Sequence, residues 1–251
     1  MTEDNANAAG DLVAGRFTLL KRLNAAGTVW KAHDLALERG VTLKELRSPT
    51  SSGPGPTDPA RQRLLREARG LARIEHPNLA TVREVLNHRP DPWLVMDLII
   101  GESLRNIVEH CPLSPAAAAH VGLDVLAALQ ASHAAGVLHR DVEPGNVLIR
   151  PDGTAVLTGF DLATLSTPTE LGIEPRNVAP ERLDGGAAGP ASDLWALGML
   201  LHACIQDHPF QNPLAAVIDA LLVRDPAHRL NETRLARLLH DVIAAEAALQ
   251  H

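Results

Sequence analysis

The sequence is poor in aromatic side chains. Its 251 residues include no tyrosine, three phenylalanines and three tryptophans, so aromatics make up only 2% of the chain. Hydrophobic residues still reach 45%, an ordinary value for a globular protein. The core is therefore expected to consist of leucine, valine, isoleucine and alanine. The length fits one large domain or two small ones that share a core.

Long runs of one kind of side chain are missing as well. No Lys/Arg run stands out and the formal net charge is −7, which argues against nucleic acid or an anionic membrane surface as a partner. The most apolar stretch, residues 191–205, contains Asp193 and is too short to span a bilayer. The polar, acidic first ten residues show no signal-peptide pattern, so we expect a cytoplasmic protein without membrane insertion.

Disulfide and metal patterns are weak. Cys111 and Cys204 could pair, but two unpaired thiols in a reducing compartment are the simpler interpretation. The twelve histidines show no H-x-x-x-H spacing. The sequence therefore favours no histidine-based metal site.

The first part of the chain carries mostly strand signals. Short β-like runs lie at residues 16–20, 28–30, 41–44 and 93–96. Residues 48–59, rich in Ser, Gly and Pro, are predicted to form a flexible loop. A helix is predicted over 60–74, where the apolar face consists of Leu64, Leu65, Ala68, Leu71 and Ala72.

Beyond residue 101 the pattern becomes helical. Ser114 is the expected N-cap of a helix that runs to about residue 135, with Pro115 at its first position. Ser192 is the expected N-cap of a helix over 193–205, and a last helix starts near Thr233. The sequence thus predicts an α+β fold with two lobes. Its parts are a flexible segment at 1–11, a small β-rich lobe at 12–98 and a larger helical lobe at 99–251.

A catalytic-loop pattern lies in the helical part. The run H-R-D-V-E-P-G-N at 139–146 resembles the loop H-R-D-x-K-x-x-N of eukaryotic-like Ser/Thr protein kinases. Further landmarks of this family follow in the correct order: V-T-L-K at 41–44, A-P-E at 179–181, S-D-L-W at 192–195 and D-P with a later arginine at 225–229. The resemblance spans about residues 12–239, is strongest to actinobacterial members, and implies a kinase-like fold.

The resemblance assigns roles to several retained residues. In the family, a strand lysine holds the α- and β-phosphates and pairs with a helix glutamate; Lys44 and Glu67 match these positions. Asp141 matches the residue that orients the substrate hydroxyl, and Asn146 matches a magnesium ligand. Other nucleotide-site positions fall on Gly27, Val29, Thr42, Met96, Leu98 and Leu148. A salt bridge that only braces the lobe is an alternative role for Lys44 and Glu67.

Three polar positions of that site are replaced. The motif D-F-G reads G-F-D at 159–161, so Gly159 stands where the metal-binding carboxylate belongs, and Asp161 is not expected to substitute for it. Glu143 replaces the catalytic-loop lysine, and Glu174 replaces the threonine that bonds the catalytic Asp and Lys. With Asp141, these residues give a formal charge of −3 where a working site has −1, unless Glu143 and Glu174 turn into solvent.

The glycine-rich nucleotide lid is shortened. L-N-A-A-G-T-V at 23–29 stands where G-x-G-x-x-G-x-V is expected, about two residues short and with Gly27 as its remaining glycine. Backbone amides approach phosphates closely only where side chains stay away. Thr42 replaces a small alanine that lies against adenine in the family, whereas Val29 and Leu148 suit an adenine pocket. We therefore expect ATP and Mg²⁺ to bind weakly or not at all.

The resemblance also marks structural and regulatory positions. Leu71, His139, Phe160 and Asp193 match residues that stack between the lobes, and Glu181 and Arg229 match a bracing ion pair. A docking helix that usually follows residues 208–210 is missing before residue 213. Hydroxyl groups that could accept phosphate from another kinase, or simply belong to a solvated loop, are Thr164, Ser166, Thr167 and Thr169.

Together these features predict a pseudokinase, a kinase fold kept as a regulatory or scaffolding module that binds a protein partner. A homodimer is left open. One alternative is a weakly active Ser/Thr kinase with unusual metal handling, in which Glu143 serves as a metal ligand. The other is a nucleotide-binding switch without phosphotransfer. The first predicts no effect of Mg-ATP, the second predicts autophosphorylation, and the third predicts stabilisation by nucleotide without turnover.

Overall fold

The chain folds into two units, each with its own sheet. The computed structural model describes residues 7–24, 26–46, 59–88, 91–160, 162, 177–205 and 213–249. The first unit comprises Met1–Glu75 and Thr81–Ile99, and the second comprises His76–Ala80 and Ile100–His251. The short segment 76–80 belongs to the second unit because the N–H of Leu157 donates to Asn78 O and the N–H of Ala80 donates to Leu157 O.

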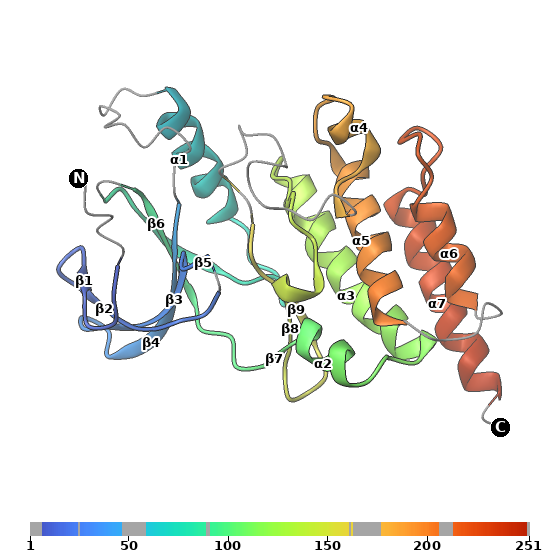
Figure 1. The fold of residues 1–251 in the computed structure, drawn as a ribbon, viewed down its shortest axis with the longest axis horizontal. Helices are drawn as coiled ribbons and strands as arrows, with labels where there is room; N and C mark the ends of the chain where they lie inside the picture. Colours follow the sequence, from blue (N-terminus) through green and yellow to red (C-terminus); the bar gives the residue numbers. More distant parts are fainter. Residues whose placement is uncertain are drawn as a thin grey trace. The chain divides into compact units, whose positions relative to one another are not determined.

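The first unit is built on a six-stranded antiparallel sheet (Figure 1). Its strands are β1 (Leu12–Val13), β2 (Phe17–Arg22), β3 (Val29–Asp34), β4 (Arg39–Glu45), β5 (Val82–Leu86) and β6 (Trp93–Asp97). Their order in the sheet is β1-β2-β3-β4-β6-β5. The four predicted β-like runs lie in β2, β3, β4 and β6, which confirms them.

Alternation along these strands buries one face of the sheet. The core cluster on this face consists of Val13, Phe17, Leu19, Trp30, Ala32, Val41, Leu43, Trp93 and Val95. Aliphatic residues dominate it as expected. Phe17, Trp30 and Trp93 are nevertheless part of it, so half of the six aromatic residues of the chain lie in this cluster.

The helix of the first unit is α1 (Pro59–Leu71). It packs against β5, and its buried Arg61 donates to Asn87 Oδ1 at 2.8 Å and to His88 O at 2.7 Å. The helix ends earlier than the predicted residue 74. Beyond Leu71, the N–H groups of Arg73 and Ile74 donate to the third preceding carbonyl, which is a tighter terminal turn. The predicted loop at 48–59 lies outside the described residues, apart from its last residue.

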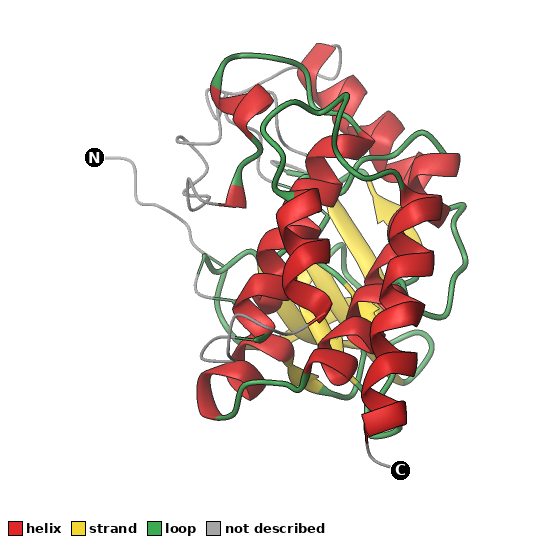
Figure 2. Ribbon diagram, turned by 90° about the vertical axis from the view of Figure 1, so that its right-hand side faces the viewer, coloured by secondary structure: helices red, strands yellow, loops and turns green. Residues whose placement is uncertain are grey.

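The second unit combines a small sheet with a group of helices (Figure 2). The strands are β7 (Glu102–Ser103), β8 (Val147–Ile149) and β9 (Ala155–Leu157), in that order, and a 3₁₀ turn (Pro144–Asn146) precedes β8. The helices are α2 (Leu104–His110), α3 (Pro115–Ala134), α4 (Pro180–Leu183), α5 (Pro190–Cys204), α6 (Pro213–Leu221) and α7 (Glu232–Leu249). The four longest of these, α3, α5, α6 and α7, pack side by side (Figure 1).

The starts of these helices test the predicted caps. Ser114 caps α3, since its side chain accepts the N–H of Ala117 at 3.2 Å. The prediction that Ser192 caps α5 is wrong, because the helix starts at Pro190. Proline suits the first helical position, and Ser192 lies within the first turn, where its Oγ accepts the N–H of Gly189 at 3.3 Å.

Two glycines permit close contact between the helices. A Cβ on Gly122 of α3 would lie 3.0 Å from Leu201 of α5 and 3.3 Å from Leu239 of α7. A Cβ on Gly198 of α5 would lie 2.8 Å from Leu221 of α6. Thus α6 packs directly on α5. The predicted loss of a docking helix concerns 208–213, of which only residue 213 is described.

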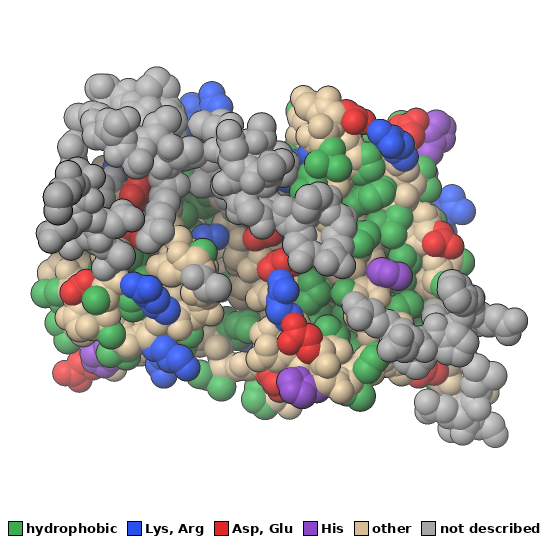
Figure 3. Space-filling view, in the orientation of Figure 1, with side chains coloured by type: hydrophobic (Ala, Val, Ile, Leu, Met, Phe, Trp, Pro, Cys, Tyr) green, Lys and Arg blue, Asp and Glu red, His purple; other side chains and the backbone are tan. Residues whose placement is uncertain are grey.

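The two cysteines do not pair with each other. Cys111 and Cys204 are both free thiols, and burial raises the pKa of Cys204 to about 12. Of the helices that the structure describes, none is long and apolar enough to cross a membrane. On the face shown in Figure 3, the described Lys/Arg and Asp/Glu side chains are interspersed.

Candidate functional site

One face of the first sheet carries four of the predicted nucleotide-site residues. The strand register pairs Val29 with Lys44 and Thr42 with Met96. Directly paired residues lie on the same face, and Thr42 and Lys44 alternate with the buried Leu43. Val29, Thr42, Lys44 and Met96 therefore share the face opposite the core cluster of this unit. A kinase uses such a face for the nucleotide.

Three other predicted residues belong to the first unit. Leu98 follows β6 and packs against Gly40, where an added Cβ would come within 3.1 Å of its Cδ2. Glu67 and Leu71 lie on α1, half-buried and buried respectively. Lys44 is half-buried too, and its pairing with Glu67 stays a prediction.

The turn between β2 and β3, at the lid position, closes on its own side chain. Asn24 Oδ1 accepts the N–H groups of Thr28 at 3.0 Å and Val29 at 2.9 Å. The N–H of Gly27, which has φ = +69°, donates to Asn24 O at 3.2 Å. Three consecutive amides of the kind that a lid offers to phosphate therefore have acceptors inside the turn. The sequence pattern showed the missing glycines but not this role of Asn24.

The same turn is held from its other side. Trp30 Nε1 donates to Gly27 O at 3.1 Å, and the Arg22 guanidinium lies 5.0 Å from the Trp30 ring. A Cβ on Gly27 would lie 3.6 Å from Arg22 Nη1. Arg22 also donates to Asn7 O at 2.6 Å, which ties the N-terminal segment to this end of the sheet.

In the second unit, the catalytic-loop residues contact one another. Asn146 Nδ2 donates to Asp141 O at 2.9 Å and to Asp141 Oδ2 at 2.8 Å. Asn146 Oδ1 fills the space beside Gly159: a Cβ on this glycine would overlap with Oδ1 and Cγ of Asn146. Gly159 has φ = +83°, a conformation that other residues rarely adopt. The Asn146 amide therefore occupies the space in which the side chain of a metal-binding aspartate would begin.

Glu143 forms an ion pair that was not predicted. Its Oε2 lies 2.9 Å from Arg105 Nη2, on α2, with the Glu143 side chain 25% exposed. Gly145 leaves room for this pair, since a Cβ there would lie 2.8 Å from Glu143 Oε1. Arg105 offsets the charge of Glu143, a positive partner that the sum of −3 over Asp141, Glu143 and Glu174 did not include, and Glu143 does not turn fully into solvent. Only the fold brings Arg105 to the loop, and Glu174 lies outside the described residues.

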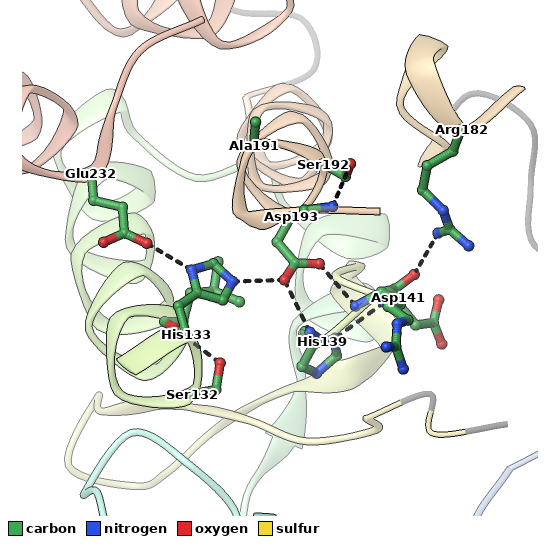
Figure 4. A network of polar contacts seen from close by, with 12 residues as sticks. Ser132, His133, His139, Asp141, Arg182, Ala191, Ser192, Asp193 and Glu232 are labelled. Atoms are coloured by element: carbon green, nitrogen blue, oxygen red, sulfur yellow. Dashed lines mark hydrogen bonds and ion pairs between the residues drawn. The ribbon is translucent and has the colours of Figure 1, made fainter. Parts of the chain in front are cut away.

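Asp193, buried in α5, holds the backbone of the catalytic loop (Figure 4). The N–H of His139 donates to its Oδ2 at 2.9 Å, and the N–H of Arg140 donates to its Oδ1 at 2.8 Å. Arg140 has φ = +67°, so this contact stabilises an uncommon conformation. Burial alone would raise the pKa of Asp193, but the hydrogen bonds from His133 and these amides keep that pKa below its ordinary value.

His139 links the loop to β9 and Phe160. Its Nε2 donates to Thr158 O at 2.7 Å, and its Nδ1 accepts the N–H of Asp141 at 3.2 Å. Because a carbonyl only accepts and an amide N–H only donates, His139 is a neutral imidazole. Its ring lies 4.3 Å from the ring of Phe160.

The predicted bracing residues form a bidentate ion pair. Arg229 Nη1 and Nη2 lie 2.9 Å and 3.0 Å from the two carboxylate oxygens of Glu181. The Arg229 side chain is fully buried, and its guanidinium lies 5.1 Å from the Trp195 ring. Burial acts to raise the pKa of Glu181, but the hydrogen bond from Arg229 keeps that pKa below its ordinary value.

Leu148, predicted to line the adenine pocket, is half-buried in β8 and pairs with Ser103 and Val156 of the neighbouring strands. Predicted residues outside the described part of the chain are Asp161, Thr164, Ser166, Thr167, Thr169 and Glu174.

Comparison with known proteins identifies the family. The family model for the protein kinase domain matches residues 25–225. The chain is 32% identical over 235 residues to the serine/threonine-protein kinase PknA of Mycobacterium tuberculosis (strain ATCC 25618 / H37Rv), with 86% of this chain and 53% of that protein covered. It is 33% identical over 263 residues to the serine/threonine-protein kinase PkaA of Streptomyces coelicolor, with coverages of 87% and 48%. The chain belongs to the protein kinase domain family.

Solved structures agree on the fold. A crystal structure of the PknI kinase domain of Mycobacterium tuberculosis matches with a TM-score of 0.75 and 24% identity, covering 94% of this chain and 100% of that one. The predicted two-lobed α+β kinase fold is thereby confirmed, and the family model and the relatives confirm the predicted protein kinase family. The chain spans about half the length of the curated relatives that it matches.

Proposed function

We propose that this chain is a pseudokinase domain, which binds a protein partner as a regulatory or scaffolding module in the cytoplasm and transfers no phosphate. One observation carries the proposal: the Asn146 amide fills the space beside Gly159 where a kinase has its metal-binding aspartate. The family resemblance alone does not decide the matter, because one fold supports different functions.

The described residues do not fit a magnesium–nucleotide complex. Kinases hold Mg²⁺ with the D-F-G aspartate and the catalytic-loop asparagine. Gly159 offers no carboxylate, so Asn146 is retained without the aspartate that shares the metal with it in a kinase. Without that aspartate, the charge that develops on a transferring phosphoryl group is poorly neutralised.

Phosphate binding is weakened at two further places. The amides of Gly27, Thr28 and Val29 already have acceptors in Asn24. Glu143 stands where the family has a lysine, and its partner Arg105 neutralises it without restoring that lysine. Both features support weak or absent binding of ATP.

An active kinase is the second candidate. Asp141 and Asn146 are retained and lie in contact, and Lys44 shares a sheet face with Val29 and Met96. The relatives named above are Ser/Thr protein kinases. A nucleotide-binding switch without phosphotransfer would use the same sheet face.

A phosphotransfer assay separates the proposal from the active-kinase candidate. The purified chain is incubated with radiolabelled ATP and Mg²⁺ or Mn²⁺, with and without a generic protein substrate. We expect no more incorporation than in the matched Asp141→Asn variant. Incorporation that depends on Asp141 would contradict the proposal.

A further inference from the structure

A buried histidine lies between two carboxylates in the second unit (Figure 4). His133, on α3, has a side chain that is 7% exposed. Its Nε2 lies 2.8 Å from Asp193 Oδ2 on α5, and its Nδ1 lies 2.7 Å from Glu232 Oε1 at the start of α7. One ring thus joins three helices through polar contacts.

The two contacts determine the protonation state of His133. An ionised carboxylate only accepts hydrogen bonds, and a neutral imidazole carries a single N–H. Both ring nitrogens face carboxylate oxygens, so both must carry a proton, and the ring is an imidazolium. Burial lowers the pKa of His133, but the hydrogen bonds to Asp193 and Glu232 outweigh it and place that pKa above its ordinary value. His139, by contrast, has one donor and one acceptor contact and is neutral.

The carboxylate that His133 contacts also holds the catalytic loop. Asp193 Oδ2 accepts from both His133 and the N–H of His139, and Asp193 Oδ1 accepts from the N–H of Arg140. A continuous series of hydrogen bonds therefore runs from Glu232 on α7 to the backbone of Arg140. Glu232 does not belong to the catalytic loop and is connected to it through His133 and Asp193.

We propose that His133 and Glu232 are positioning residues that couple α7 to the catalytic loop. The His133 imidazolium orients the Asp193 carboxylate so that it receives the amides of His139 and Arg140, and Glu232 keeps the imidazolium in place. The coupling does not depend on whether the chain transfers phosphate.

The other end of α7 provides a matched control. Glu246 Oε2 accepts the N–H of Ala116 at 2.7 Å, at the start of α3. Glu232 and Glu246 therefore join the same two helices at opposite ends, and only Glu232 is connected to the loop. Loss of Glu246 weakens helix packing without touching Asp193.

Site-resolved amide hydrogen exchange tests the coupling. In Glu232→Ala, we expect exchange at His139 and Arg140 to rise roughly fivefold, the effect of one lost hydrogen bond. In Glu246→Ala, exchange at these two amides should not change. An unchanged rate in Glu232→Ala, or an equal rise in both variants, would overturn the proposal.

A pH titration tests the imidazolium. The groups that face His133 are Asp193 from α5 and Glu232 from α7, while His139 faces Asp193 from the loop. A histidine whose pKa is raised on folding stabilises the fold fully below about pH 6.5, and this contribution is lost as the pH rises through the folded pKa. The Tm difference between the unchanged chain and His133→Gln should therefore be largest near pH 6 and shrink at higher pH.

Nitrogen NMR of the unchanged chain gives an independent reading. Both ring nitrogens of His133 should carry protons at neutral pH, while His139 shows one. A neutral His133 ring at pH 6.5, or a Tm difference that grows with pH, would overturn the proposal. The NMR result decides the matter even if His133→Gln does not fold.

Discussion

Gly159 adopts φ = +83° beside Asn146, whose amide occupies the space of a side chain at this position. The loss of the metal ligand is therefore more than the deletion of one carboxylate. The backbone conformation and the neighbouring side chain both suit glycine. An aspartate restored at position 159 would require Asn146 to move, so this single change is not expected to rebuild a metal site.

Gly159→Ala should lower the Tm more than Gly153→Ala. Both glycines have positive φ, so each substitution costs roughly 1–2 kcal/mol in backbone strain. An added Cβ meets nothing within 4 Å at Gly153, whereas at Gly159 it overlaps with Asn146, and overpacking adds roughly 1–3 kcal/mol. Thermal unfolding of the two variants measures the difference.

A double variant gives the control for this prediction. Asn146→Ala removes the overlapping amide, so the additional loss caused by Gly159→Ala should largely disappear in its presence. Equal Tm values for the two glycine variants would show that the Asn146 amide does not occupy this space.

Motif spacing predicts some residues of the site and not others. Lys44, Asp141 and Asn146 could be assigned from sequence because each has a fixed place in a family motif. Arg105 could not, because only the fold brings α2 to Glu143. Asn24 gave a weaker signal, since asparagine side chains often accept backbone N–H groups in turns.

At the scale of elements, the lid turn and the helix starts show what local patterns determine. The strands were predictable because their side chains alternate between a buried and an exposed face. The start of α5 was not, because Pro190 provides a better first helical residue than a cap at Ser192. Sequence showed a short lid, but not that the turn satisfies its own amides.

Asn24→Ala should expose the amides of the lid turn. Thr28 and Val29 lose the acceptor of their N–H groups, and each hydrogen bond contributes about 1 kcal/mol. Amide exchange at Thr28 and Val29 should rise severalfold, while exchange in the core strand β6 stays unchanged. Unaltered exchange at both residues would show that the amides do not depend on Asn24.

Glu181→Ala should destabilise the fold far more than Asp184→Ala. Glu181 pairs with the fully buried Arg229, and removing one partner of a buried pair costs roughly 3–5 kcal/mol. Asp184 pairs with Arg224 at 3.2 Å with both side chains largely exposed, which is typically worth about 0–1 kcal/mol. Denaturant unfolding of both variants compares the two pairs, and similar losses would disprove the bracing role of Glu181.

At the scale of the whole molecule, the family model and the relatives identify the family and leave the activity open. A kinase fold with an intact ion pair and intact loop anchoring is compatible with catalysis and with binding alone. The decision depends on the few positions at which Gly159, Glu143 and Asn24 depart from the family pattern. The chain also spans about half of its curated relatives, so activities of those whole proteins are not transferred to it.

Thermal unfolding with ATP, in the presence and absence of Mg²⁺, tests the central claim most directly. A ligand at 100 times its Kd adds about 2.7 kcal/mol to the free energy of unfolding, a change that raises the Tm by several degrees. Gly159 stands in place of the metal-binding carboxylate, and the lid amides of Gly27, Thr28 and Val29 already have acceptors in Asn24. Millimolar Mg-ATP should therefore leave the Tm unchanged. A magnesium-dependent rise of several degrees would contradict the pseudokinase account.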